Sequence, residues 1–195
     1  RYNAAVDDGY EDDEINYKRG YIHYRDKNYD RATEMFHNYK PDNDFVGPDN
    51  LIYARANTLY HRGNYVAAEA LYRELLDRLR TERARIRTLL VDEDTDHRSL
   101  VENLVRVQNN LGVTQYRIGE RRGDADNPRL SEALANLQAS TELSSNYLRE
   151  YETGQRAETT DLAFLNIRAM LYPDDEGFAP QIYEELPRDT QQALW

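Results

Sequence analysis

The stretch from Asn50 to Leu76 shows the pattern of apolar positions most clearly, with helical spacing broken once by a turn. Ile52, Ala56 and Leu59 stand at i, i+4 and i+7, so they share one face of a helix. Gly63-Asn64 interrupts the pattern, and both residue types tolerate the left-handed backbone found at helix ends. A second apolar face follows in Tyr65, Ala68, Leu71, Tyr72, Leu75 and Leu76. The stretch therefore predicts two helices joined by a tight turn.

The same arrangement of residues recurs 36 positions earlier in the chain. The alignment pairs Gly20 with Ala56, Tyr24 with Tyr60, Asn28-Tyr29 with Asn64-Tyr65, Ala32 with Ala68, and Phe36 with Tyr72. A third copy comprises Leu111, Gly112 and Tyr116, then Ala133 and Leu137, with an inserted, protruding loop expected between Gly119 and Arg129. The chain is thus predicted to repeat a helix–turn–helix unit.

This order of small, aromatic, small and aromatic residues resembles the tetratricopeptide repeat family, whose unit is about 34 residues long. The resemblance implies an all-α fold, a right-handed α–α superhelix, or solenoid, of helix–turn–helix repeats. The copies depart from the family pattern at one position that usually holds a large aromatic residue. Here that position is occupied by Asn16, Ile52 and Gln108.

The domain organisation follows from these copies. Residues 1–13 form an acidic lead-in, and residues 14–157 hold three repeats at about 14–47, 49–92 and 98–150. Residues 158–195 are interpreted as a degenerate fourth repeat or a C-terminal cap, because repeat arrays need a modified end. In that part, Asp161–Tyr172 and Ala179–Leu186 are both expected to be helical. Long helices are expected at 65–90 and 100–119, with a break at VDEDTDHRS between them.

Charge and composition narrow the classes of partner. The chain of 195 residues has a formal net charge of −11 and therefore repels a phosphate backbone, so a nucleic-acid partner is not expected. No apolar run approaches a membrane span, so direct membrane insertion is not expected. The chain contains no cysteine, which excludes disulfides. It begins with Arg1 rather than methionine, and we interpret it as an excerpt of a larger protein whose compartment the sequence does not assign.

Motifs that carry chemistry are not found, so a non-catalytic protein without cofactor or metal is expected. The sequence contains no phosphate-binding loop, nucleophile elbow or zinc-binding helix motif. Asp92, Asp94 and Asp96 have the spacing that opens a calcium loop. His97 replaces the required glycine, however, and Asn103 replaces the bidentate glutamate. The stretch is therefore predicted to be a solvated loop.

Two surfaces are candidates for binding a partner. In the family the first helix of each unit lines a concave groove, and tyrosine and asparagine suit the gripping of a peptide. The alternative is that these tyrosines pack between helices. The second candidate is an arginine stripe, which is either a solvated face paired with neighbouring acids or a docking face for an acidic segment. The groove residues are Tyr17, Tyr21, Tyr24, Asn50, Tyr53, Asn57, Tyr60, Arg106, Asn109 and Tyr116, and the stripe is Arg73, Arg80, Arg83 and Arg87.

Together these features predict a non-catalytic scaffold or adaptor that holds a protein or peptide segment in a groove rich in tyrosine and asparagine. The alternative hypothesis is a structural section of a longer repeat protein that self-associates or supports a larger assembly.

Overall fold

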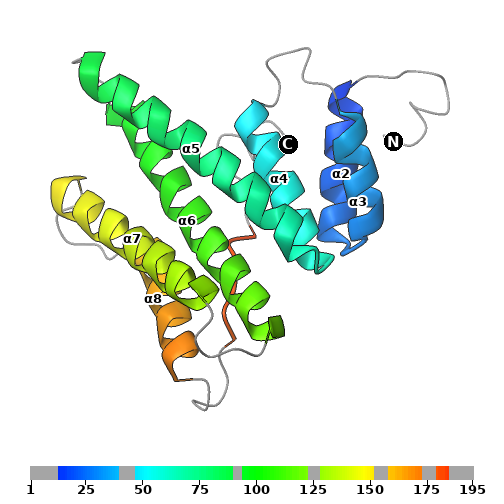
Figure 1. The fold of residues 1–195 in the computed structure, drawn as a ribbon. Helices are drawn as coiled ribbons and strands as arrows, with labels where there is room; N and C mark the ends of the chain where they lie inside the picture. The colour runs from blue at the N-terminus through cyan, green and yellow to red at the C-terminus, as the bar shows by residue number, and fades with distance from the viewer. Residues whose placement is uncertain are drawn as a thin grey trace. The chain divides into compact units, whose positions relative to one another are not determined.

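The described part of the chain is entirely helical apart from turns and one extended segment. The computed structural model describes residues 13–39, 47–89, 94–122, 128–151, 158–172 and 179–184, and within them it contains helices and no strand. The all-α prediction is confirmed for these residues. The helices are α2 (Asp13–Arg25), α3 (Tyr29–Asn38), α4 (Pro48–His61), α5 (Tyr65–Leu89), α6 (Asp94–Arg122), α7 (Pro128–Tyr151) and α8 (Glu158–Leu171) (Figure 1).

The chain divides into two compact units, and the division falls inside α5. The first unit comprises residues 1–71 and 185–195, so its described part is α2, α3, α4 and the first turns of α5. The second unit comprises residues 72–184, with the remainder of α5, then α6, α7, α8 and the segment 179–184. Of the acidic lead-in, only Asp13 is among the described residues, and it opens α2.

In the first unit, the turn before α3 and the turn before α5 have the same backbone. Lys27 and Gly63 both adopt a left-handed φ, of 59° and 73°. One residue later, Asn28 and Asn64 each accept a hydrogen bond from the backbone N–H three residues on, at 3.4 Å in both cases. Such a cap satisfies one of the free donors at a helix N-terminus. The two turns agree with the 36-residue alignment of the sequence.

Small residues allow close contact between helices within each unit. A Cβ added at Gly20 in α2 would lie 2.7 Å from the ring of Phe36 in α3. A Cβ at Gly112 in α6 would lie 2.8 Å from the side chain of Leu137 and 2.9 Å from the backbone oxygen of Ala133, both in α7. The same kind of contact therefore joins α2 to α3 and α6 to α7. The alanines that the alignment places at equivalent positions, Ala32, Ala68 and Ala133, are fully buried.

In the second unit α6 is the central element. It packs against α7 and α8, and every residue from 104 to 115 is buried. A helix buried on all sides is normally apolar throughout, but this one carries buried Arg106, Gln108, Asn109, Asn110 and Gln115. Buried polar side chains need hydrogen-bond partners, so this part of α6 is a candidate for a polar binding site.

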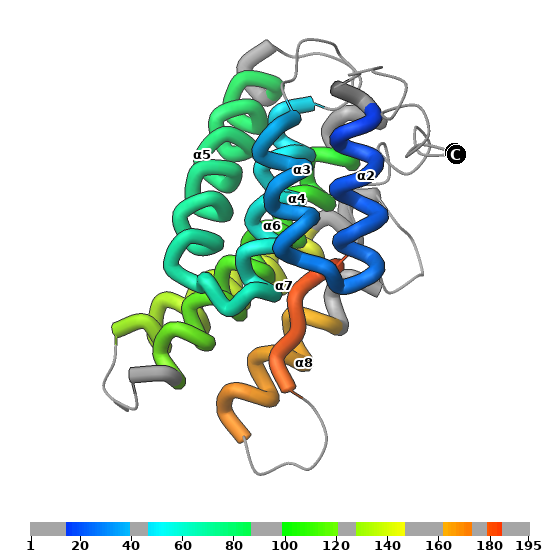
Figure 2. The backbone as a smooth tube through the Cα atoms, turned by 90° about the vertical axis from the view of Figure 1, so that its right-hand side faces the viewer, coloured from blue at the N-terminus to red at the C-terminus, as the bar shows by residue number. Residues whose placement is uncertain are grey.

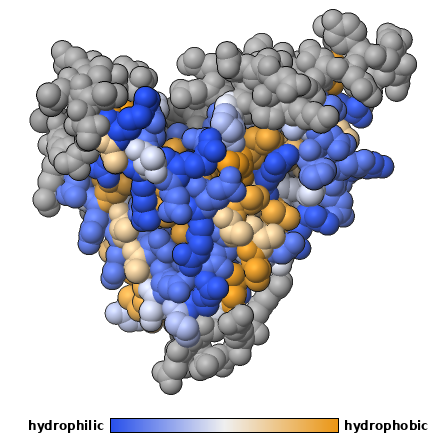
Figure 3. All heavy atoms as spheres, turned by 45° about the horizontal axis from the view of Figure 1, so that its top comes forward, coloured by the Kyte–Doolittle hydropathy of each residue, from blue (hydrophilic) through white to orange (hydrophobic). Residues whose placement is uncertain are grey.

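On the face of the molecule shown in Figure 3, apolar surface lies in patches between hydrophilic side chains.

Several boundaries differ from the sequence-based expectations. The helix expected at 65–90 is found as α5. Part of the expected break VDEDTDHRS is helical, because α6 begins at Asp94. The helices on either side of the expected inserted loop are longer than predicted, since α6 continues to Arg122 and α7 begins at Pro128, and the rest of that loop lies outside the described residues. The helix predicted at 179–186 is wrong for residues 179–184, which are not helical. The Pro180 carbonyl oxygen and the main-chain groups of Gln181 and Tyr183 form hydrogen bonds with side chains of α6 and α8.

Candidate functional site

The candidate site is built by three asparagines that the structure buries completely. Asn109 and Asn110 lie on α6, Asn166 lies on α8, and each has a fractional exposure of 0%. A carboxamide offers two N–H donors and one oxygen that accepts, so each buried asparagine needs several partners. All three reach the same target, the extended segment 179–184, which Figure 2 shows in red. We call Asn109, Asn110 and Asn166 the asparagine clamp.

One half of the clamp holds the main chain of Gln181. The Asn166 Oδ1 accepts a hydrogen bond from the Gln181 N–H at 2.8 Å, and the Asn166 Nδ2 donates to the Gln181 carbonyl oxygen at 2.8 Å. The Asn109 Nδ2 donates to the same carbonyl at 3.2 Å. The Asn166 Nδ2 also donates to the Asn109 Oδ1 at 2.8 Å, which orients the two amides relative to each other. Both main-chain groups of Gln181 are thereby satisfied.

The other half of the clamp holds the main chain of Tyr183. The Asn110 Oδ1 accepts from the Tyr183 N–H at 2.7 Å, and the Asn110 Nδ2 donates to the Tyr183 carbonyl oxygen at 3.2 Å. The Asn110 Nδ2 also lies 3.4 Å from the Tyr72 hydroxyl on α5. The clamp therefore grips two alternate residues of the segment through paired donors and acceptors, as the edge of a β-strand does.

The side chains of the segment alternate in burial, as expected for an extended backbone. Pro180 and Ile182 are buried, and Ile182 is only 4% exposed. Gln181 between them is exposed, and Tyr183 is half-buried. A guanidinium N–H of Arg117 on α6 donates to the carbonyl oxygen of Pro180 at 3.4 Å. The site therefore binds the main-chain groups of Gln181 and Tyr183 and buries the apolar side chain of Ile182 between them.

In the first unit, the predicted groove residues are largely buried. Tyr17 contacts the rings of Phe36 and Tyr39, with centroids 5.5 Å apart in both pairs, so it takes part in packing between helices. Burial raises the pKa of its hydroxyl. Tyr24 contacts the rings of Tyr29 and His61. Among the other predicted residues of this unit, Tyr53, Asn57 and Tyr60 are buried, and Tyr21 and Asn50 are half-buried.

In the second unit, one predicted groove residue belongs to the clamp. Asn109 bonds the main chain of the segment, whereas Arg106 is buried and Tyr116 is half-buried. Desolvation, together with a hydrogen bond to Glu120 and the charge of that residue, raises the pKa of Tyr116 to about 12. The sequence reasoning missed Asn110 and Asn166. Asn166 is a polar residue between apolar neighbours in a helical pattern, which is a signal that could have indicated it, whereas Asn110 stands in the polar run Gln108-Asn109-Asn110 and has no such signal.

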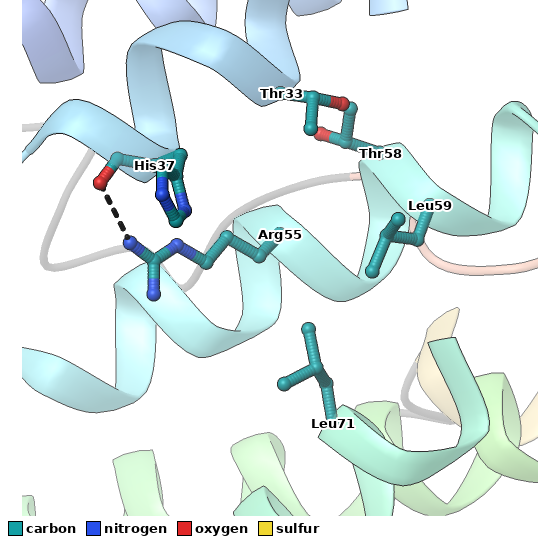
Figure 4. Close-up of a pocket in the computed structure, with 6 residues that line it drawn as sticks. All are labelled: Thr33, His37, Arg55, Thr58, Leu59 and Leu71. Atoms are coloured by element: carbon teal, nitrogen blue, oxygen red, sulfur yellow. Dashed lines mark hydrogen bonds between the residues drawn. The ribbon is translucent and has the colours of Figure 1, made fainter. Parts of the chain in front are cut away.

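A small cavity in the first unit is a weaker candidate (Figure 4). Its volume is about 150 Å³, below the roughly 300–1,000 Å³ typical of ligand pockets. The Arg55 guanidinium at its wall donates to the carbonyl oxygens of Phe36 and His37 at the end of α3. A cation there satisfies free carbonyls at a helix C-terminus. The remaining lining residues are Thr33, Thr58, Leu59 and Leu71.

The arginine stripe on α5 is not uniform. Arg73 pairs with Glu132 of α7 at 2.8 Å, and both side chains are about half exposed. Arg80 is exposed, whereas the Arg83 Nε is buried and has no hydrogen-bond partner. The Arg87 side chain lies outside the described part. One member of the stripe is therefore part of an interhelical ion pair of the kind that contributes little to stability.

The described residues offer neither a metal site nor a membrane-spanning helix. Where the structure is described, no three metal-ligating side chains gather in a group, and no helix has the length and apolarity needed to cross a membrane. Of the acidic residues that resemble a calcium loop, Asp92 lies outside the described ranges and Asp94 is the first residue of α6. Comparisons with protein-family models, with curated proteins and with solved structures give no match to this chain.

Proposed function

We propose that this chain is a non-catalytic helical scaffold that binds a protein or peptide segment in extended conformation. One observation carries the proposal: three buried asparagines satisfy both main-chain groups of Gln181 and of Tyr183. Because these contacts go to the main chain, another extended segment can form them if neither clamped residue is proline. The proposed site therefore recognises backbone conformation first and side chains second.

The proposed architecture is a solenoid of helix–turn–helix repeats similar to the tetratricopeptide repeat family. The equivalent caps at Asn28 and Asn64 support this architecture, as do the close contacts at Gly20 and Gly112. In such a solenoid, successive helix pairs form an extended concave binding surface. Asn109 on α6, which the alignment assigns to that surface, is covered by the segment 179–184 and bonds its main chain.

The strength of the contact fits reversible binding. A neutral hydrogen bond contributes about 0.5–1.5 kcal/mol net, and burial of an isoleucine side chain contributes about 1.5–3 kcal/mol. Ordering a flexible segment opposes both contributions. A segment held by the clamp and by one residue equivalent to Ile182 is therefore expected to bind with modest affinity.

Nuclear magnetic resonance tests the proposal directly on the full chain. A peptide with the sequence of residues 179–184 is added at about millimolar concentration or higher, which is needed to compete with the tethered segment. The main-chain N–H signals of Gln181 and Tyr183 in the full chain are followed, because the peptide offers the asparagines the same partners as the segment it replaces. We expect these signals to shift while the signal of Asn38, an exposed residue at the end of α3, stays in place. A peptide with proline at both clamped positions is expected to cause no shift. Gln181 and Tyr183 signals that respond to neither peptide would contradict the proposal.

The second candidate function is a section of a longer array that self-associates or supports an assembly. Four apolar residues at α8 favour it, because the end of a repeat array is normally polar or covered. They are Phe164, Leu165, Leu171 and Tyr172, with exposed fractions of 58%, 38%, 53% and 61%.

Sedimentation equilibrium tests this second candidate. The wild type is expected to associate with rising concentration, and Phe164→Ser with Leu171→Ser is expected to abolish the association. Val66→Ser is the matched control, because Val66 is 67% exposed on α5 and should leave the association unchanged. A wild type that stays monomeric throughout would refute the candidate.

A further inference from the structure

We propose that residues 179–184 are a displaceable occupant of the asparagine clamp, so that a partner polypeptide binds only when this segment leaves. The inference rests on the proposed function and deepens it in two ways. It gives the site a built-in competitor, and it defines the class of ligand as an extended segment with one apolar residue between two residues that are not proline.

The contacts of the segment are of a kind that a partner can reproduce. All five hydrogen bonds between the clamp and the segment involve main-chain N–H or carbonyl groups of Gln181 and Tyr183. The Gln181 side chain is exposed and the Tyr183 side chain is half-buried. The identity of the residue at a clamped position therefore contributes little to those bonds.

Three asparagines are also an unusual choice for a permanent contact. Burial of a carboxamide is unfavourable unless its hydrogen bonds are made, and apolar partners of the same shape can give equal or greater stability. Asparagines have a different advantage, because water can replace the segment on their amides when it leaves. A contact that opens and closes needs such groups at Asn109, Asn110 and Asn166.

The buried side chains of the segment define what a competing ligand presents. Ile182 is 4% exposed and lies between the two clamped residues. Pro180 is buried as well, and its carbonyl oxygen accepts from Arg117. The expected ligand therefore has an apolar residue at the position of Ile182, residues with a free N–H on either side of it, and tolerance for proline at the position of Pro180.

Tethering explains why the wild type should resist such a ligand. The segment begins seven residues after Tyr172, the residue that follows α8. A short tether gives an effective concentration on the order of millimolar. A free peptide at micromolar concentration therefore competes poorly until the segment is weakened.

The test uses the full chain with Tyr183→Pro, which removes the N–H that donates to the Asn110 Oδ1 and leaves the clamp unchanged. The probe is a fluorescein-labelled peptide with the sequence of residues 179–184, followed by anisotropy. We expect Tyr183→Pro to bind the peptide about tenfold more tightly than the wild type, or better, because one such hydrogen bond changes an equilibrium by roughly that factor. Addition of Asn110→Ala to Tyr183→Pro should remove the gain.

The matched control is Ala179→Ser, which changes an exposed side chain of the same segment and leaves both clamped residues as they are. It should bind the peptide as the wild type does. Far-ultraviolet circular dichroism checks that the helices remain. If Tyr183→Pro fails to fold, Ile182→Asp serves instead, since it expels the segment by placing a charge at a buried position.

The outcomes separate this inference from the proposed function. Equal, measurable binding to wild type and Tyr183→Pro would overturn the displaceable occupant and leave the proposed function standing. If neither protein bound the peptide, both proposals would fall. If wild-type chains formed dimers by exchanging residues 179–184, the clamp would be filled by a second copy of this chain. That result would overturn the inference that a different polypeptide binds there.

Discussion

Replacement of Asn166 by aspartate is the most direct perturbation of the clamp, because it changes the chemistry and keeps the shape. The Asn166 Nδ2 donates to two oxygens, the Asn109 Oδ1 and the Gln181 carbonyl, both at 2.8 Å. In Asn166→Asp that nitrogen becomes an oxygen, which donates nothing when ionised. Two oxygens then face a carboxylate at a site with no solvent exposure.

The magnitude follows from the cost of charging that group. Burial and two facing acceptors raise a carboxyl pKa, and for fully buried groups the rise reaches about 3–5 units. A more modest rise of about 2–3 units corresponds to roughly 3–4 kcal/mol, or a factor of about 10²–10³ in the ratio of bound to released segment. When residues 179–184 leave the clamp, water reaches the aspartate and the charge is solvated. The substitution therefore lowers the stability of the protein by no more than the free energy that holds the segment in the clamp.

The sign of the pH dependence is fixed by the direction of the shift. The folded pKa lies above the unfolded value of about 3.9, so the protonated acid is favoured while the segment is bound. The protonated acid can donate one hydrogen bond to an oxygen that Asn166 served. Binding of the segment is therefore retained at low pH and lost as the pH rises through the folded pKa, expected near pH 6–7 from a rise of about 2–3 units.

Amide nuclear magnetic resonance measures this directly. The N–H signals of Gln181 and Tyr183 are compared between Asn166→Asp and wild type at about pH 5 and about pH 8, on either side of the expected pKa. We expect released-segment signals in the variant at the higher pH only. Asn64→Asp is the control, because Asn64 is an exposed helix cap and aspartate caps a helix as well as asparagine does. A variant that kept the segment bound at both pH values would refute the reasoning.

Three further perturbations test the packing and the titration behaviour. Gly112→Ala should lower the stability of the protein in thermal unfolding by about 1–3 kcal/mol, because the added Cβ would lie 2.9 Å from the Ala133 backbone oxygen. This loss is expected although alanine is favoured over glycine in a helix by about 1 kcal/mol. Unchanged stability would contradict the close contact. The free energy of urea unfolding of Tyr17→Phe should stay within about 1 kcal/mol of the wild-type value, since the buried Tyr17 hydroxyl has no hydrogen-bond partner. Tyr17→Ala should lower that free energy by about 3–5 kcal/mol. Equal effects of the two substitutions would contradict a packing role of the ring. The phenolate absorbance of Tyr116 should appear near its raised pKa of about 12. Glu120→Gln should move that pKa towards the ordinary value, because the hydrogen bond and the charge of Glu120 favour the neutral phenol. An unchanged titration would exclude that role of Glu120.

The local pattern of the sequence predicts much of the helical structure, because helices and their turns depend on neighbouring residues. The break at Gly63-Asn64 is a turn with the predicted left-handed φ at Gly63, and the long helix expected from Tyr65 is α5. The same periodicity could not decide whether a tyrosine is buried or lines a groove. Tyr17 has the spacing of a groove residue but is fully buried.

Only the tertiary structure brings the clamp together. Asn109 and Gln181 are 72 positions apart, and their hydrogen bond has no signal in local spacing. The helix expected at 179–186 is wrong for the described residues for the same reason: the N–H groups of Gln181 and Tyr183 bond to asparagines of α8 and α6. A sequence determines which main-chain groups can form a helix, but the side chains brought near them by folding determine which hydrogen bonds they make.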